Sequence, residues 1–151
     1  NMDVKTPSIR RYRACEVMLQ EAGVDCINAC LEQEFNRQTY QVEIERLLRQ
    51  YPQADGLFST DLIALNAMKL LNTHGVNVPD AFSIVGYDGV EISSLCTPAL
   101  THVRQPLQQL ADVCVQTLVR KMQGESLTKN VILEDVELVR GGTTRPMADP
   151  V

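Results

Sequence analysis

The sequence lacks the features on which membrane-spanning and exported proteins depend. Its 151 residues contain no tryptophan, three phenylalanines and four tyrosines, and its longest hydrophobic runs are only a few residues. A helix that crosses a bilayer needs about 20 consecutive apolar residues, so a membrane span is excluded. Residues 1–9 contain no basic segment followed by a hydrophobic one, and therefore no visible secretory signal.

Positive charge and catalytic motifs are also scarce. The chain has 14 Lys and Arg residues against 19 Asp and Glu, for a formal net charge of −5. Phosphate contact needs a basic face, so this balance argues against nucleic-acid binding by this chain alone. The motifs G-x-S-x-G and H-E-x-x-H and a Walker loop are missing, and the two histidines, His74 and His102, lie far apart. We therefore expect no enzyme activity, no cofactor and no metal site.

The cysteines point to a reducing compartment. They are Cys15, Cys26, Cys30, Cys96 and Cys114. Their number is odd and no C-x-x-C occurs, so neither a disulfide framework nor a zinc ribbon is indicated. Most of them lie on apolar stripes, where a cysteine acts as a small hydrophobic residue. We expect a cytoplasmic protein with reduced thiols.

The composition, 44% hydrophobic and 22% charged, is that of an ordinary globular domain. Apolar periodicity and Pro and Gly breaks predict helices that alternate with strands. We expect helices over residues 6–22, 40–51, 61–74, 90–95 and 106–123, and strands over residues 24–30, 56–59, 81–87, 100–105 and 131–139. This alternation predicts the α/β class, with a parallel sheet covered by helices on both faces.

Polar residues follow the predicted strands. Thr60 and Asp61 come directly after one strand, Asp88 ends the next, and the polar stretch 32–38 follows the first. Right-handed crossovers place the carboxyl ends of parallel strands at one edge of the sheet, where ligands of such folds bind. We therefore expect a small-molecule site at this edge.

Each of these residues also has a structural interpretation. The Asp88 carboxylate can accept bonds from neighbouring hydroxyls of a sugar or ribose, or it can cap the turn over residues 90–95. Asp61 suits the first turn of a helix, where the helix dipole favours a negative charge. The only basic cluster, Arg10, Arg11 and Arg13, is either a solvated helix face or the source of a guanidinium fork for a ligand.

Four blocks of the chain resemble the lac-repressor/GalR (LacI) family of transcriptional regulators. They are ADGLFSTD at 54–61 with IALNA at 63–67, VPDAFSIVGYD at 78–88, PALTHVRQP at 98–106, and LVRGGTT at 138–144. They occur in the order and spacing of that family. The resemblance implies one lobe of a periplasmic-binding-protein-like (type I) domain, which binds a small sugar-like or nucleoside-like effector in a cleft between two lobes.

The resemblance also implies particular site residues. It assigns effector contacts to Arg11, Thr60, Asp61, Asp88 and Gln105. It assigns a dimer interface to Leu62, Leu65, Met68, Ile92 and Cys96, about half of which also fit packing within the lobe. The chain departs from the family pattern at four positions. Thr60 stands where Asn is usual, Gly89 stands where a second Asp is common, and Ala14 and Cys15 replace the usual Gly and large aromatic after the arginine.

On this interpretation residues 1–151 are a C-terminal fragment of an effector-binding domain, without the first lobe and the DNA-binding domain. The helix over residues 107–123 carries an apolar stripe that would normally pack on the first lobe. Without that lobe we expect it to pack on another chain or on the sheet; the alternative is an ordinary sheet-covering helix.

We therefore expect the effector-sensing and dimerisation part of a bacterial repressor, in a homodimer or higher homo-oligomer that contacts DNA only through the absent domain. The alternative is a fragment of an exported sugar-binding transport protein with the same fold. A small α/β enzyme is a third candidate, but the chain has no nucleophile–base constellation.

Overall fold

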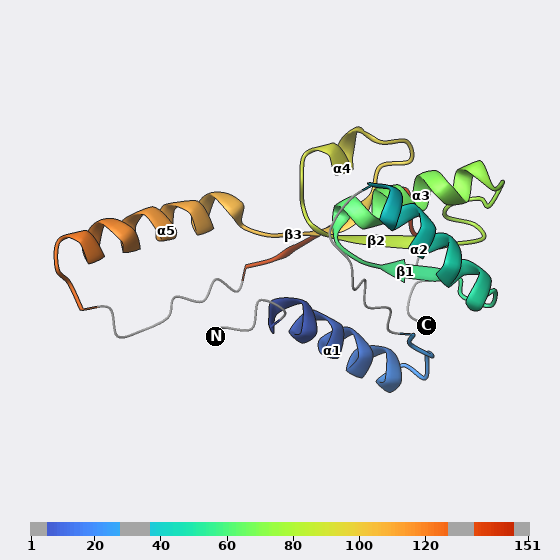
Figure 1. Cartoon of the computed structure of the whole chain (residues 1–151), viewed down its shortest axis with the longest axis horizontal. Helices are drawn as coiled ribbons and strands as arrows, with labels where there is room; N and C mark the ends of the chain where they lie inside the picture. Colours follow the sequence, from blue (N-terminus) through green and yellow to red (C-terminus); the bar gives the residue numbers. More distant parts are fainter. Residues whose placement is uncertain (1–5, 28–36, 127–134, 147–151) are drawn as a thin grey trace. The chain divides into compact units, whose positions relative to one another are not determined.

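The computed structural model describes residues 6–27, 37–126 and 135–146 (Figure 1). The chain divides into two compact units, residues 1–34 and 35–151, and each is described by itself. Within the described residues, no helix is both long and apolar enough to cross a membrane.

The described part of the first unit, residues 6–27, begins with the helix α1 (Thr6–Glu21). It ends as the glycine predicts: Gly23 has φ 69°, and the Val24 amide donates to the Leu19 carbonyl at 2.8 Å. The strand expected over residues 24–30 is not formed at Val24–Ile27, which have no regular structure, while residues 28–30 lie outside the described part. The strand prediction is therefore wrong for Val24–Ile27. Alternating polarity does not show whether a neighbouring strand is available for pairing.

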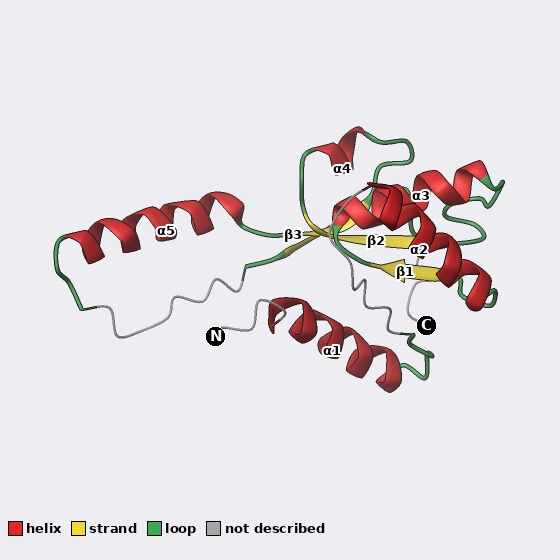
Figure 2. Ribbon diagram, in the orientation of Figure 1, coloured by secondary structure: helices red, strands yellow, loops and turns green. Residues whose placement is uncertain are grey.

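The second unit is a mixed α/β structure whose sheet is mostly parallel (Figure 2). In chain order it contains α2 (Arg37–Gln50), β1 (Gly56–Phe58), α3 (Asp61–Thr73), β2 (Ser83–Asp88), α4 (Ile92–Leu95), β3 (Thr101–Arg104), α5 (Leu107–Met122) and β4 (Glu137–Val139). The sheet order is β1-β2-β3-β4, in which the first three strands are parallel and β4 is antiparallel to β3. The predicted α/β class is confirmed.

The core lies between α3 and the sheet. Ala64, Met68 and Leu71 of α3 pack with Ile84 of β2 and with Leu100, the residue before β3. Burying an Ile, Leu or Met side chain contributes about 1.5–3 kcal/mol, so this layer supplies much of the unit's stability. The second helix, α2, packs against α3 and buries Tyr40 and Ile44.

The opposite side of the sheet has a different character. Side chains alternate along a strand, so Val85 and Tyr87 point away from the side that carries Ile84. Both are half-buried within this unit, and Tyr87 meets Phe58 of β1 edge to face, with ring centroids 6.3 Å apart.

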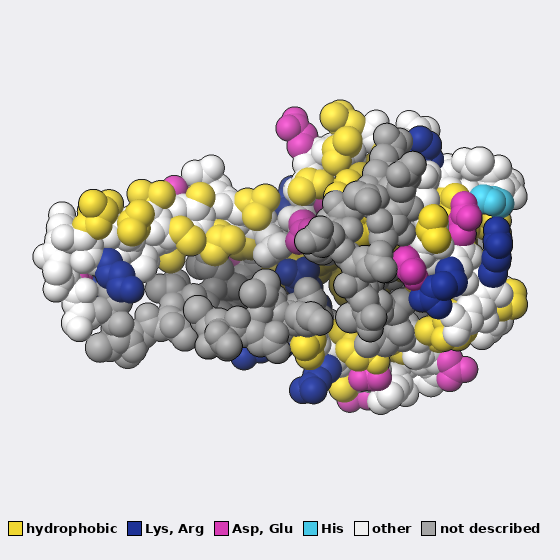
Figure 3. All heavy atoms as spheres, viewed as in Figure 1, with side chains coloured by type: hydrophobic (Ala, Val, Ile, Leu, Met, Phe, Trp, Pro, Cys, Tyr) yellow, Lys and Arg dark blue, Asp and Glu magenta, His cyan; other side chains and the backbone are white. Residues whose placement is uncertain are grey.

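The fifth helix buries none of its residues. Its exposed apolar side chains form a stripe, visible along the helix in Figure 3, which we call the α5 stripe: Leu107, Leu110, Val115, Leu118, Val119 and Met122. An exposed apolar patch that follows one helix is typical of an interaction surface.

A C-terminal threonine joins the beginnings of β2 and β3. Thr143 is fully buried, its hydroxyl donates to the Ile84 carbonyl at 2.7 Å, and it accepts a bond from the Thr101 amide at 2.9 Å. The Thr143 carbonyl also accepts from the Ile84 amide at 2.8 Å. The Thr143 hydroxyl therefore bridges the backbones of β2 and β3 at this point.

We predict that Thr143→Val lowers the free energy of unfolding by about 1–3 kcal/mol, because it leaves a buried amide and a buried carbonyl without the hydroxyl. Urea denaturation followed by circular dichroism measures the change. The control is Thr73→Val, since the exposed Thr73 hydroxyl bonds only to Lys69 in its own helix. Equal stability of the two variants would contradict the role given to Thr143.

Candidate functional site

Three predicted site residues follow the carboxyl ends of neighbouring parallel strands. Thr60 follows β1, Asp88 is the last residue of β2, and Gln105 follows β3. Parallel pairing places these strand ends at one edge of the sheet, as the sequence predicts. The edge therefore presents a hydroxyl, a carboxylate and an amide.

Asp88 is held in an unusual backbone conformation. Its φ is 135°, in the region that favours glycine, and its carbonyl accepts a bond from the Gln105 amide at 3.2 Å. A non-glycine residue in such a region costs about 1–3 kcal/mol, and such residues are concentrated at ligand sites. The side-chain amide of Gln105 donates to Asp88 Oδ1 at 2.9 Å. Gln105 therefore fixes the orientation of the half-buried carboxylate.

The residue after Asp88 has to be small. Gly89 has φ 80°, and a β-carbon there would lie 2.6 Å from Cγ of Arg104. The guanidinium of Arg104 reaches Glu137 of β4 at 3.3 Å. The LacI family commonly has a second aspartate at this position. In this chain the side chain of such an aspartate would require Arg104 to move.

Asp61 is a structural anchor at the same edge. Its side chain is 1% exposed, and Oδ2 accepts bonds from the amides of Gly89 and Val90, both at 2.9 Å, and from the Ser93 hydroxyl at 2.8 Å. Hydrogen bonds to an ionised acceptor are the stronger ones. Asp61 therefore fastens the first turn of α3 to the turn that follows Asp88.

Thr60 precedes α3 as its N-cap residue. Its hydroxyl makes no capping bond to the helix, and the residue is half-buried. Arg11 lies in α1, in the first unit, and is also half-buried. Since the two units are described separately, the effector contact assigned to Arg11 stays a prediction.

The residues expected at a dimer interface divide into two groups. Leu62 and Ile92 are more than half exposed, as is Leu95, which lies in the same short helix as Ile92. Leu65 and Cys96 pack against the core, and Met68 is 6% exposed within it. Met68 is therefore corrected to a core residue, because its position on α3 faces β2 rather than the surface.

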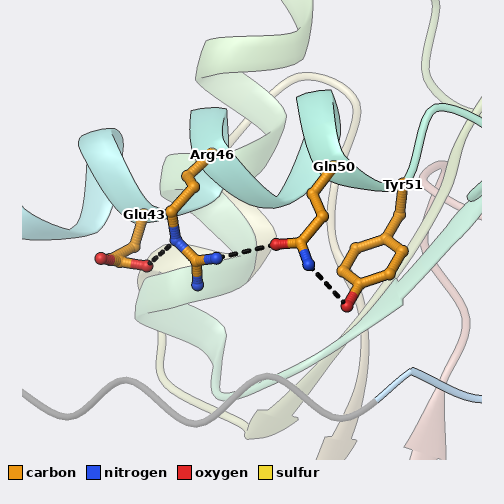
Figure 4. A network of polar contacts seen from close by, with 4 residues as sticks. All are labelled: Glu43, Arg46, Gln50 and Tyr51. Atoms are coloured by element: carbon orange, nitrogen blue, oxygen red, sulfur yellow. Dashed lines mark hydrogen bonds and ion pairs between the residues drawn. The ribbon is translucent and has the colours of Figure 1, made fainter.

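The outer face of α2 carries a series of polar contacts between side chains (Figure 4). The guanidinium of Arg46 donates to Glu43 and to Gln50, both at 2.8 Å, and the Gln50 amide donates to the Tyr51 hydroxyl at 3.1 Å. Exposed pairs of this kind contribute about 0–1 kcal/mol to the stability of a protein. We therefore interpret these contacts as features of a solvated helix face. Among the described residues, no group of three or more His, Cys, Asp or Glu is placed to hold a metal ion.

The mostly parallel sheet with polar residues at its carboxyl edge defines a ligand-binding α/β domain. The chain belongs to the periplasmic-binding-protein-like domain family, whose model matches residues 1–144, and within it to the LacI-type transcriptional regulators. It is 32% identical over 123 residues to the ribose operon repressor of Halalkalibacterium halodurans, covering 81% of this chain and 37% of that protein.

Solved structures agree with this assignment. The transcription regulator CcpA of Lactococcus lactis matches with a TM-score of 0.80 and 27% identity, over 95% of this chain and 52% of that one. A dimeric Lac repressor matches with a TM-score of 0.75 and 27% identity, over 89% of this chain and 49% of that one. The chain spans about a third of the curated repressor and half of each structure.

We predict that Gly86→Ala destabilises the domain by about 1–3 kcal/mol, the usual cost of overpacking a core. A β-carbon at Gly86 would overlap Oδ1 of Asp61 and lie 2.7 Å from Leu100 Cδ2. The matched control is Gly56→Ala on β1, where the nearest atom is 3.7 Å away. Urea denaturation of the two variants tests the prediction, and a Gly86 variant as stable as the control would contradict it.

Proposed function

We propose that the chain is the effector-sensing and dimerisation part of a LacI-type repressor. The observation that carries this proposal is the Asp88 carboxylate, held by Gln105 at the carboxyl edge of the parallel strands. A ligand-binding residue fixed by a neighbouring side chain is already oriented before the ligand arrives, which reduces the entropy cost of binding.

The proposed effector is a small molecule with adjacent hydroxyl groups, sugar-like or nucleoside-like. A carboxylate offers about four acceptor sites, which suits the binding of adjacent hydroxyl groups of a ligand. Thr60 adds a hydroxyl at the same edge, and the effector contact that the family resemblance assigns to Arg11 stays a prediction. Asp61 enters the proposal as a positioning residue, because its buried carboxylate holds the turn after Asp88.

The remaining parts of the proposed regulator lie in the rest of the whole protein. The α5 stripe packs on the first lobe of the effector domain, which supplies the other wall of the cleft. Effector binding then favours one arrangement of the two lobes and changes the affinity of a DNA-binding domain. The coverage of 37% of the ribose operon repressor supports this division, since most of that protein lies outside the match.

The proposed partner is a second copy of the regulator. Leu62 at the start of α3 and Ile92 and Leu95 of α4 supply exposed apolar side chains. The matched dimeric Lac repressor supports a homodimer. We propose that the regulator is not an enzyme, needs no cofactor, and works in the cytoplasm, where it meets DNA.

Asp88→Asn is expected to weaken effector binding by the whole regulator about tenfold to a hundredfold, because a bond to a charged group contributes about 1.5–3 kcal/mol. Isothermal titration with a panel of sugars and nucleosides identifies the effector and measures both affinities. The control is Asp80→Asn, which removes the same charge from an exposed turn where Asp80 bonds Asn77. Unchanged affinity of the Asp88 variant, or tight binding by residues 1–151 alone, would contradict the proposed cleft.

Replacing both Ile92 and Leu95 by Glu is expected to raise the dimer dissociation constant of the whole regulator at least about tenfold, or ~1.4 kcal/mol. The reason is that four like charges would face one another across a two-fold interface. Sedimentation equilibrium measures the constant. Val42→Glu, on the exposed face of α2, serves as the control, and a double variant that dimerises like this control would exclude α4 from the interface.

A further inference from the structure

Three charged residues lie next to one another across three neighbouring strands, at the edge that carries the candidate site. The register places Arg104 of β3 beside Asp88 of β2 and, on its other side, beside Glu137 of β4. Neighbouring strands are about 4.8 Å apart, which is less than the length of an extended arginine side chain. One cation therefore stands between two acidic residues, of which only Asp88 is a proposed effector contact.

The side chain of Arg104 is directed to Glu137. Its Nη1 donates to Glu137 Oε2 at 3.3 Å, and the two side chains are 49% and 67% exposed. The stem of Arg104 lies against Gly89, where a β-carbon would be 2.6 Å from Cγ and 2.8 Å from Cβ of Arg104. The missing side chain at Gly89 therefore leaves room for the stem, and Glu137 binds the guanidinium at its end.

Asp88 is oriented by a neutral donor. Gln105 Nε2 donates to Asp88 Oδ1 at 2.9 Å, and the Gln105 backbone amide donates to the Asp88 carbonyl at 3.2 Å. A guanidinium binds a carboxylate more strongly than an amide does, and its fork matches both carboxylate oxygens at once. An arginine on Asp88 would therefore occupy the oxygens that the proposed effector needs.

We propose that Glu137 is a positioning residue for the effector site, because it holds the Arg104 guanidinium at β4 and prevents it from competing with the effector for Asp88. The inference rests on the proposed function, since it concerns the same carboxylate. Glu137 acts through Arg104 and makes no contact with the effector itself.

Glu137→Gln tests this role directly, because it removes the charge and keeps the size of an exposed side chain. The released guanidinium should then pair with Asp88 in a fraction of the molecules. The apparent dissociation constant rises in inverse proportion to the fraction of molecules that can still bind. A fivefold weaker affinity corresponds to the Arg104–Asp88 pair in about four fifths of the molecules.

Isothermal titration of the whole regulator measures the effect, with the sugar or nucleoside that binds the unmodified regulator most tightly. Glu137→Gln should raise the dissociation constant about fivefold. Adding Arg104→Gln to this variant should recover most of the lost affinity, because the competing cation is gone. The matched control is Glu43→Gln, which breaks another exposed Arg–Glu pair, with Arg46 at 2.8 Å on α2, and should leave the affinity unchanged.

The titrations separate this inference from the proposed function. If Asp88→Asn weakens binding but Glu137→Gln binds like the Glu43→Gln control, the inference is overturned and the proposed function stands. A loss of affinity that persists after Arg104→Gln is added would also overturn it, because Glu137 would then act by another route. If Asp88→Asn leaves the affinity unchanged, the proposed function fails.

A measurement without effector tests the competition itself. Asp88→Asn is introduced into the 151-residue chain and into its Glu137→Gln variant, and urea denaturation gives the folding equilibrium constants. The loss caused by Asp88→Asn should be about threefold larger in the Glu137→Gln background, because there it also removes the pair with Arg104. Adding Arg104→Gln to all four chains should abolish the difference. Additive effects of Asp88→Asn and Glu137→Gln would overturn the proposal.

Discussion

The buried carboxylate of Asp61 is the interaction on which the candidate site depends. Asp61 lies in the first turn of α3. Its carboxylate accepts hydrogen bonds from two backbone amides and one hydroxyl of the segment that follows β2. One side chain therefore ties a helix to a turn across the edge of the sheet. The approach is possible because Gly86 has no β-carbon to occupy the space that the carboxylate fills. The three hydrogen bonds to Oδ2 offset part of the cost of burying this polar side chain.

The anchor explains why Asp88 can hold a strained backbone. A φ of 135° is unfavourable for any residue with a side chain, and the chain around it has to compensate. Asp61 holds Gly89 and Val90 on one side, and Gln105 holds the carbonyl and the side chain of Asp88 itself. The strain is thus compensated by bonds from two elements. The result is a carboxylate whose direction is fixed before any ligand binds.

Much of the second unit could be predicted from the sequence, and the errors have physical causes. Helices such as α3 and α5 follow apolar periodicity and proline or glycine breaks, so their positions were predicted within a few residues. Val24–Ile27 were expected to be a strand, but strand formation depends on a pairing partner that a local pattern does not reveal. Met68 was expected at a dimer surface, but the helix turns it towards β2.

The sequence by itself determined the α/β class, the family and the set of polar residues at the carboxyl ends of the strands, because these depend on local periodicity and short motifs. Only the tertiary structure decided what each residue does. It made Asp61 an anchor and Gln105 the partner of Asp88. These roles depend on distances between segments that are remote in the chain. Such distances are fixed by packing and hydrogen bonding and not by residue type.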